Sequence, residues 1–132
     1  MDLNGFVAYD FSRRTPQISV TNNGVTFNSG VTESLGKPEF AMVYTSEESR
    51  SIVIVPAERK GQYTKRYFSP KKGGVKNVRW NDKALNQMLY HFIKPGERAP
   101  DVYAYRVLGE SGYCDKKGAY GVLFDLKKAI CL

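Results

Sequence analysis

The chain has 132 residues, of which 42% are hydrophobic and 25% are charged, and its formal net charge at pH 7 is +7. This length accommodates one domain with a buried core that needs no metal ion or disulfide for stability. The sequence has no run of the roughly eighteen apolar residues that a membrane helix needs, and its N-terminus lacks the basic-then-apolar order of a signal peptide. We therefore expect a folded cytoplasmic protein.

Metal and disulfide chemistry has few candidate residues. The chain contains two cysteines, Cys114 and Cys131, and one histidine, His91. A structural zinc site normally uses four Cys or His ligands, so the sequence argues against one built from a single chain. In a reducing compartment the two thiols are expected to stay unpaired, and a redox role for either is left open. We expect no cofactor.

The N-terminal part favours strands. Residues 5–11 are short, aromatic and β-prone, and they predict a strand. Apolar and polar residues alternate at 18–20 and again at 25–27. Asn22, Asn23 and Gly24 lie between these segments and are typical turn residues, which predicts a tight hairpin or a bulge in one longer strand.

A short helix is expected at about 30–35. Asn28 or Ser29 provides a side-chain oxygen that can cap it. Two strands joined by a polar turn should follow, at 40–44 and 52–55. The second is a β-branched run, which indicates burial on both faces.

A basic band covers residues 59–81, which hold eight basic residues and no acidic one. Residues 1–58 carry four basic and seven acidic groups, net −3, and residues 82–132 carry eight and six, net +2. The positive charge of the chain is therefore local. The basic residues of the band are Arg59, Lys60, Lys65, Arg66, Lys71, Lys72, Lys76 and Arg79.

Short strands and one clear helix are predicted within and after the band. Residues 63–68 and 78–80 show the period of two that strands require. The helix is expected at 82–93, with Asn81 as its cap. Its apolar stripe would consist of Ala84, Leu85, Met88, Leu89 and Phe92, opposite Lys83, Asn86, Gln87, Tyr90 and His91.

The C-terminal part predicts a last pair of strands at 102–108 and 119–126. A glycine-rich loop at 109–118 would join them. The tail, residues 127–132, fits a helical turn or a strand end. The predicted fold class is therefore α+β, mostly antiparallel, in one domain.

An internal repeat is indicated by the order of these elements. The pattern valine, polar, aromatic, asparagine occurs at 25–28 and at 78–81. Each copy precedes a helix and then two strands. The chain would then consist of halves 1–58 and 75–132, joined by the basic segment 59–74 and packed on each other as a pseudo-two-fold pair.

The first copy resembles the swapped-hairpin barrel family of AbrB, MazE and SpoVT-type DNA-binding domains. The resemblance covers residues 18–57, with a divergent second copy at 75–130, and depends on element order and on the step Leu35-Gly36. It implies a small barrel built from two interlocked halves, in a homodimer or in a pseudo-symmetric monomer, and a role in transcription regulation. The family's usual proline and basic residue are replaced here by Asn28-Ser29, so no DNA-contact residue carries over.

The basic band predicts binding of nucleic acid, with DNA favoured over RNA. Lysine and arginine side chains would neutralise phosphates and release counterions. Tyr63 and Tyr67 are candidates for stacking on exposed bases. The competing interpretation is a solvated basic strand whose aromatic residues form core.

Two other functions remain open. One is a protein-interaction module or inhibitor, of phage or mobile-element type, that docks on an acidic protein or nucleoprotein. The other is an RNA-cleaving, toxin-like enzyme. Enzyme activity is not expected, because Cys114 and His91 have no second histidine to serve as a base or to orient them.

Overall fold

The computed structural model describes residues 1–8, 14–70, 77–113 and 120–132. Its strands and helices account for most of these residues and confirm a mostly antiparallel α+β fold. In chain order the elements are β1 (Gln17–Thr21), β2 (Gly24–Phe27), α1 (Ser29–Ser34), β3 (Phe40–Ser46), β4 (Ser51–Ala57), β5 (Thr64–Arg66), β6 (Val78–Trp80), α2 (Lys83–Ile93), β7 (Ala104–Tyr113), β8 (Tyr120–Asp125), the 3-10 helix η1 (Leu126–Lys128) and β9 (Ile130–Cys131).

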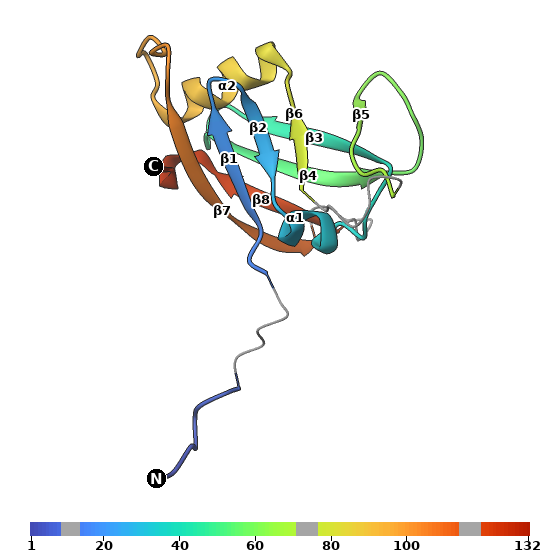
Figure 1. Cartoon of the computed structure of the whole chain (residues 1–132), viewed down its shortest axis with the longest axis vertical. Coiled ribbons are helices and arrows are strands. Elements are labelled where there is room, and N and C mark those ends of the chain that lie inside the picture. The colour runs from blue at the N-terminus through green and yellow to red at the C-terminus, as the bar shows by residue number, and fades with distance from the viewer. Residues whose placement is uncertain (9–13, 71–76, 114–119) are drawn as a thin grey trace.

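The strands form one antiparallel sheet that curls into a half-barrel (Figure 1). Their order is β5-β3-β4-β8-β7-β1-β2-β6, and β9 adds to β7. The N-terminal half of β7 pairs with β1, and its C-terminal half pairs with β8. The change of partner falls at Gly109, where a Cβ atom would lie 2.6 Å from the ring of Phe124.

The predicted hairpin between β1 and β2 is confirmed. Thr21 pairs with Gly24 across a two-residue turn. Gly24 has a φ of +143°, and a Cβ atom there would lie 2.6 Å from the carbonyl oxygen of Trp80. Glycine is therefore required both by its backbone conformation and by the close approach of β6.

Asn28 is confirmed as the cap of α1. Its Oδ1 accepts hydrogen bonds from the backbone amides of Val31 at 3.1 Å and Gln17 at 3.0 Å. The assignment of Asn81 to the second helix is wrong, because Asp82 is the cap of α2 and accepts from the amide of Leu85 at 2.9 Å.

Three predicted elements differ in extent from those observed. Residues 5–8 form no strand, and the rest of that predicted strand lies outside the described residues. The expected loop at 109–118 begins too early, because β7 continues to Tyr113 through its pairing with β8. The tail contains both a helical turn, η1, and a strand, β9.

The buried face of α2 also differs from the predicted stripe. Met88 is exposed, whereas Tyr90 is buried. The helix packs against β1, β2 and η1, and it directs Tyr90 toward the rings of Tyr103 and Tyr105. A polar hydroxyl at the ring edge allows tyrosine to occupy such a boundary position. The buried residues of α2 are Asn86, Leu89, Tyr90, Phe92 and Ile93.

The order strand, helix, strand, strand occurs twice, as β2-α1-β3-β4 and as β6-α2-β7-β8. Strand pairs join the two sets, since β2 pairs with β6 and β4 pairs with β8. The core consequently draws on both sets. Its fully buried larger side chains are Phe27, Phe124, Ile18, Ile52, Ile54, Leu89 and Leu126.

Candidate nucleic-acid interface

The described part of the basic band lies at the two ends of the strand order. Lys65 and Arg66 belong to β5, and Arg79 belongs to β6. Arg59 and Lys60 are exposed in the connection from β4 to β5. The remaining predicted contacts, Lys71, Lys72 and Lys76, lie outside the described residues.

A side-chain hydrogen bond brings these two ends together. The indole Nε1 of Trp80 in β6 donates to the carbonyl oxygen of Arg66 in β5 across 3.0 Å. The ammonium group of Lys65 lies 5.9 Å from the centre of the same indole ring, within cation–π range. Basic residues from opposite ends of the sheet are therefore neighbours.

An aromatic cluster lies beneath this junction. Phe27, Tyr67 and Trp80 meet edge to face, with ring centres 4.9 to 6.0 Å apart. The hydroxyl of Tyr67 shares a buried hydrogen bond of 3.0 Å with Thr32. Burial raises the pKa of the Tyr67 hydroxyl far above its usual value, although the bond to Thr32 opposes that shift.

The cluster limits which aromatic residues of the band can meet a ligand. Tyr67 and Trp80 are only 5% and 4% exposed, whereas Tyr63 is 76% exposed. Phe68 is half-buried against the core. Tyr63 is therefore the candidate that remains for stacking, and Tyr67 takes a structural position instead.

Two adjoining hollows lie beside the junction, and we call them together the basic groove. The first has a volume of about 660 Å³ and is lined by Lys37, Glu39, Arg66, Phe68, Ser69 and Pro70. The second has a volume of about 310 Å³ and is lined by Arg66, Tyr67, Phe68, Ser69, Asn77, Val78 and Arg79. Arg66, Phe68 and Ser69 line both hollows, so the two hollows are adjacent.

Positive charge predominates in the basic groove. The two hollows are lined by three cations, Lys37, Arg66 and Arg79, and by one carboxylate, Glu39. Glu39 pairs with Arg66 at 3.3 Å, and both side chains are well exposed. Such a surface pair is weak, so Arg66 can exchange it for a phosphate at little cost. Arg79 is positioned by a hydrogen bond of 3.1 Å from its Nη2 to the carbonyl oxygen of Asn23.

Lys37 is the groove residue that sequence reasoning missed. It lies 22 residues before Arg59 in the chain, in a segment of net negative charge. The pairing of β3 with β5 carries the Lys37–Glu39 segment to Arg66. Only the step Leu35-Gly36, predicted to end the short helix, indicated a change of chain direction here.

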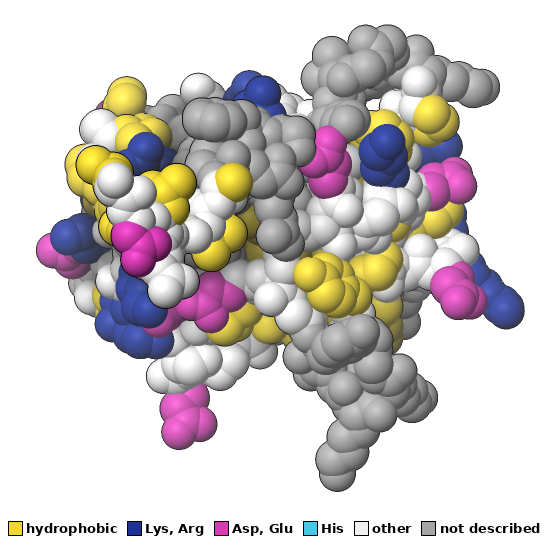
Figure 2. All heavy atoms as spheres, turned by 90° about the horizontal axis from the view of Figure 1, so that it is seen from below, with side chains coloured by type: hydrophobic (Ala, Val, Ile, Leu, Met, Phe, Trp, Pro, Cys, Tyr) yellow, Lys and Arg dark blue, Asp and Glu magenta, His cyan; other side chains and the backbone are white. Residues whose placement is uncertain are grey.

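Charges on the face seen from below are mixed. Figure 2 shows Lys and Arg side chains interspersed with Asp and Glu on that face, with no single-sign patch among the described residues. A mixed surface gives little attraction for a polyanion.

The described residues give little support for a catalytic histidine, a reactive cysteine or a metal site. His91 lies 3.9 Å from the exposed Glu47, at the surface. Cys131 is an exposed thiol, and Cys114 lies outside the described residues. In the described ranges no three His, Cys, Asp or Glu side chains gather as metal ligands would, and no helix there has the length and apolarity to cross a membrane.

Comparison with known proteins identifies no relative. No protein family, curated protein or solved structure matches the chain. A functional assignment therefore depends on the geometry of the chain itself.

Proposed function

We propose that the protein binds nucleic acid, with duplex DNA as the preferred form, and that the basic groove and its neighbouring cations contact the phosphates. The contact residues are Arg59, Lys60, Lys65, Arg66 and Arg79 of the band together with Lys37. Each neutralised phosphate releases condensed counterions, and this release supplies most of the sequence-independent affinity.

The observation that carries the proposal is the hydrogen bond between Trp80 and Arg66. Without it, β5 and β6 would be the two free ends of a curled sheet, and their cations would be separate. With it, Arg66 and Arg79 line the same hollow, and the ammonium group of Lys65 lies beside them over the ring of Trp80. A run of closely spaced cations on ordered backbone matches a regularly spaced row of phosphates better than isolated charges do.

The burial of the band's aromatic residues supports duplex over single strand. Binding of unpaired bases relies on exposed rings as stacking platforms. The four aromatic residues of the band are all described, and Tyr63 is the one among them that is exposed. The surface is therefore better suited to backbone phosphates than to a series of unstacked bases.

The strand pairing supports a pseudo-two-fold arrangement of the AbrB type. Val25 pairs with Trp80, Thr26 with Arg79 and Phe27 with Val78. Thr26 and Arg79 occupy equivalent positions in the two four-residue patterns, so a two-fold axis through this pair would exchange the strands and preserve the register. We infer that one chain supplies both halves of the barrel, and that the protein acts as a transcription-regulator-type module.

Fluorescence anisotropy with labelled duplex DNA, single-stranded DNA and RNA at low salt tests the proposal. The triple variant Lys65→Ala, Arg66→Ala and Arg79→Ala should bind duplex DNA at least about 30-fold more weakly than the wild type at equal salt. The matched control is the triple variant Lys94→Ala, Arg98→Ala and Lys128→Ala. It removes the same charge from exposed residues that follow α2 or lie in η1.

Equal losses in the two variants would show that only net charge matters and would overturn the role of the groove. Absence of binding to all three nucleic acids would overturn the proposal and favour an acidic protein partner. Degradation of the RNA during the assay would indicate the toxin-like enzyme instead.

A further inference from the structure

Four neighbouring strands, β7, β1, β2 and β6, carry a row of paired polar residues. Figure 1 shows these strands side by side, in the order in which they are hydrogen-bonded. Ser19 pairs with Arg106 on one side and with Thr26 on the other, and Thr26 pairs with Arg79. Directly paired residues point to the same face of a sheet. We call these four residues the arginine row.

The arginine row lies on the face of the sheet that points away from the core. Side chains alternate between the two faces along a strand, and the residues next to the row are buried. Arg79 itself is exposed, and the other three members are partly exposed. The buried neighbours on β1, β2 and β7 are Ile18, Val20, Val25, Phe27 and Val107.

Arg106 is a cation without a counter-charge. Among the described residues no carboxylate forms a salt bridge with it, and its Nε has no hydrogen-bond partner. That nitrogen is enclosed, so a ligand would meet the terminal nitrogens of the guanidinium group. Glu110, the next acidic residue of β7, lies four residues further along, roughly 13 Å away. An unpaired guanidinium group in such surroundings favours an anion such as a phosphate.

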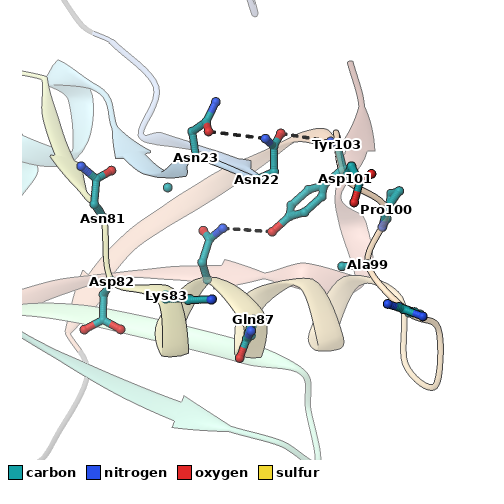
Figure 3. Close-up of a pocket in the computed structure, with 13 residues that line it drawn as sticks. Asn22, Asn23, Asn81, Asp82, Lys83, Gln87, Ala99, Pro100, Asp101 and Tyr103 are labelled. Atoms are coloured by element: carbon teal, nitrogen blue, oxygen red, sulfur yellow. Dashed lines mark hydrogen bonds between the residues drawn. The ribbon is translucent and has the colours of Figure 1, made fainter.

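The β1–β2 turn connects the two outer strands of the row. On the β6 side, the carbonyl oxygen of Asn23 accepts from Nη2 of Arg79 across 3.1 Å. On the β7 side, Oδ1 of Asn22 accepts from the backbone amide of Tyr103 across 3.2 Å, just before β7 begins (Figure 3). The spacing of the row is thus supported both by the strand ladder and by this turn.

The spacing of the two arginines is suited to duplex DNA. Neighbouring strands lie about 4.8 Å apart, so three steps separate the backbones of Arg79 and Arg106 by roughly 14 Å. The major groove of B-DNA is about 12 Å wide and has phosphates of both strands along its sides. Ser19 and Thr26 are short, so they leave the space between the arginines open, and their hydroxyls can donate to phosphates or base edges.

We infer that the arginine row is a second contact surface for duplex DNA, with Arg79 and Arg106 on phosphates of opposite strands. The inference rests on the proposed function and deepens it. Arg79 lines the basic groove and also ends the row, so one duplex passes from the groove across β6, β2 and β1 to β7. Arg106 lies outside the basic band and adds a contact that the band does not include.

Arg106→Met tests the new contact by fluorescence anisotropy with duplex DNA. The variant keeps an unbranched side chain and removes the guanidinium group. Duplex affinity should fall about five- to tenfold, and the slope of log affinity against log salt should fall by about one. The matched control is Lys94→Met, which removes one charge from an exposed residue at the end of α2 that Arg50 holds against the β3–β4 turn. The control should bind nearly as the wild type does.

Two further measurements separate charge from packing. Arg106→Lys keeps the charge, so it should lose no more than about threefold in duplex affinity. The urea midpoint of Arg106→Met should not fall below that of the wild type, because the nitrogen removed has no partner. If Arg106→Lys binds as weakly as Arg106→Met, the charge of Arg106 does not contact phosphate and the inference is overturned.

Single-stranded DNA tests the two-strand arrangement. It offers no second row of phosphates at this separation, so Arg106→Met should change its affinity less than about twofold. Equal losses for duplex and single strand would overturn the placement of the two arginines on opposite strands. If the wild type binds duplex DNA through the groove but Arg106→Met binds it as well as Lys94→Met does, the arginine row fails and the proposed function stands. Absence of wild-type binding overturns both.

Discussion

Arg50 donates from its Nε to the backbone carbonyl of Phe92 across 2.7 Å, and thereby fastens the β3–β4 turn to the C-terminal end of α2. Its Nη2 donates to the next carbonyl, that of Ile93, across 3.2 Å. The last carbonyls of a helix have no partner within the helix, and a cation there also meets the negative end of its dipole. One side chain thus joins the first hairpin to the second helix.

The Arg50→Ala variant should lower the free energy of unfolding by about 2 kcal/mol, because two carbonyls lose a charged donor. Urea denaturation followed by circular dichroism measures it. Arg50→Lys keeps the charge but cannot reach both carbonyls, so it should fall between wild type and alanine. A loss below about 0.5 kcal/mol in the alanine variant would show that water replaces the guanidinium without cost.

The Trp80→Phe variant tests the bond between β6 and β5. The ring is retained, but the carbonyl oxygen of Arg66 loses its indole donor, which should cost about 1 to 2 kcal/mol in the free energy of unfolding. Relative to the wild type, amide hydrogen exchange should accelerate more in β5 than in β3. Tyr63→Phe removes an exposed hydroxyl nearby and should change neither measurement. Unaltered exchange in β5 would mean that its pairing with β3 is sufficient to hold it.

Lys37 provides a test of the groove that leaves the basic band intact. Its φ of +54° lies in the left-handed region, which asparagine adopts readily, so Lys37→Asn removes the charge without straining the backbone. The variant should bind duplex DNA more weakly, and the slope of log affinity against log salt should fall by about one. Its urea midpoint should equal that of the wild type. An unchanged slope would remove Lys37 from the interface.

The buried hydroxyl of Tyr67 predicts a loss of stability in alkali. Burial raises its pKa in the folded protein above the usual value of 10.0, so the unfolded chain gives up its proton first. The stabilisation is therefore complete below the unfolded pKa and is lost as the pH rises above it. Between roughly pH 9 and pH 11 the wild type should lose about 1 kcal/mol more than Tyr67→Phe.

Tyr90 and Tyr103, whose pKa values burial also raises, remain in the Tyr67→Phe variant and serve as its internal reference. Urea midpoints at the two pH values give the comparison. Parallel losses in wild type and variant would show that the Tyr67 hydroxyl ionises as easily in the folded protein as in the unfolded chain.

Local patterns predicted most elements of the fold because each depends on nearby residues. The hairpin at Asn22-Asn23 and the cap at Asn28 follow from turn and cap chemistry and were predicted correctly. The buried face of α2 was not predicted correctly, because Tyr90 is buried by the rings of Tyr103 and Tyr105, just before and within β7. Tertiary packing decides such positions, and a single sequence does not show it.

The candidate site was predicted in part for the same reason. The charge of the basic band is visible in the sequence, and two of its residues, Arg66 and Arg79, line the same hollow. Lys37 joins them only through the pairing of β3 with β5.

The change of strand partner at Gly109 affects how the molecule unfolds. At this residue β7 leaves β1 and joins β8, so one continuous strand in the middle of the strand order joins the two halves of the curled sheet. The side chains of Val122 and Phe124 occupy the space that a Cβ would need, at 2.7 and 2.6 Å. The two halves of the sheet are therefore joined through one strand, whose two pairings adjoin at Gly109. The protein should melt in a single cooperative transition in which no isolated half survives.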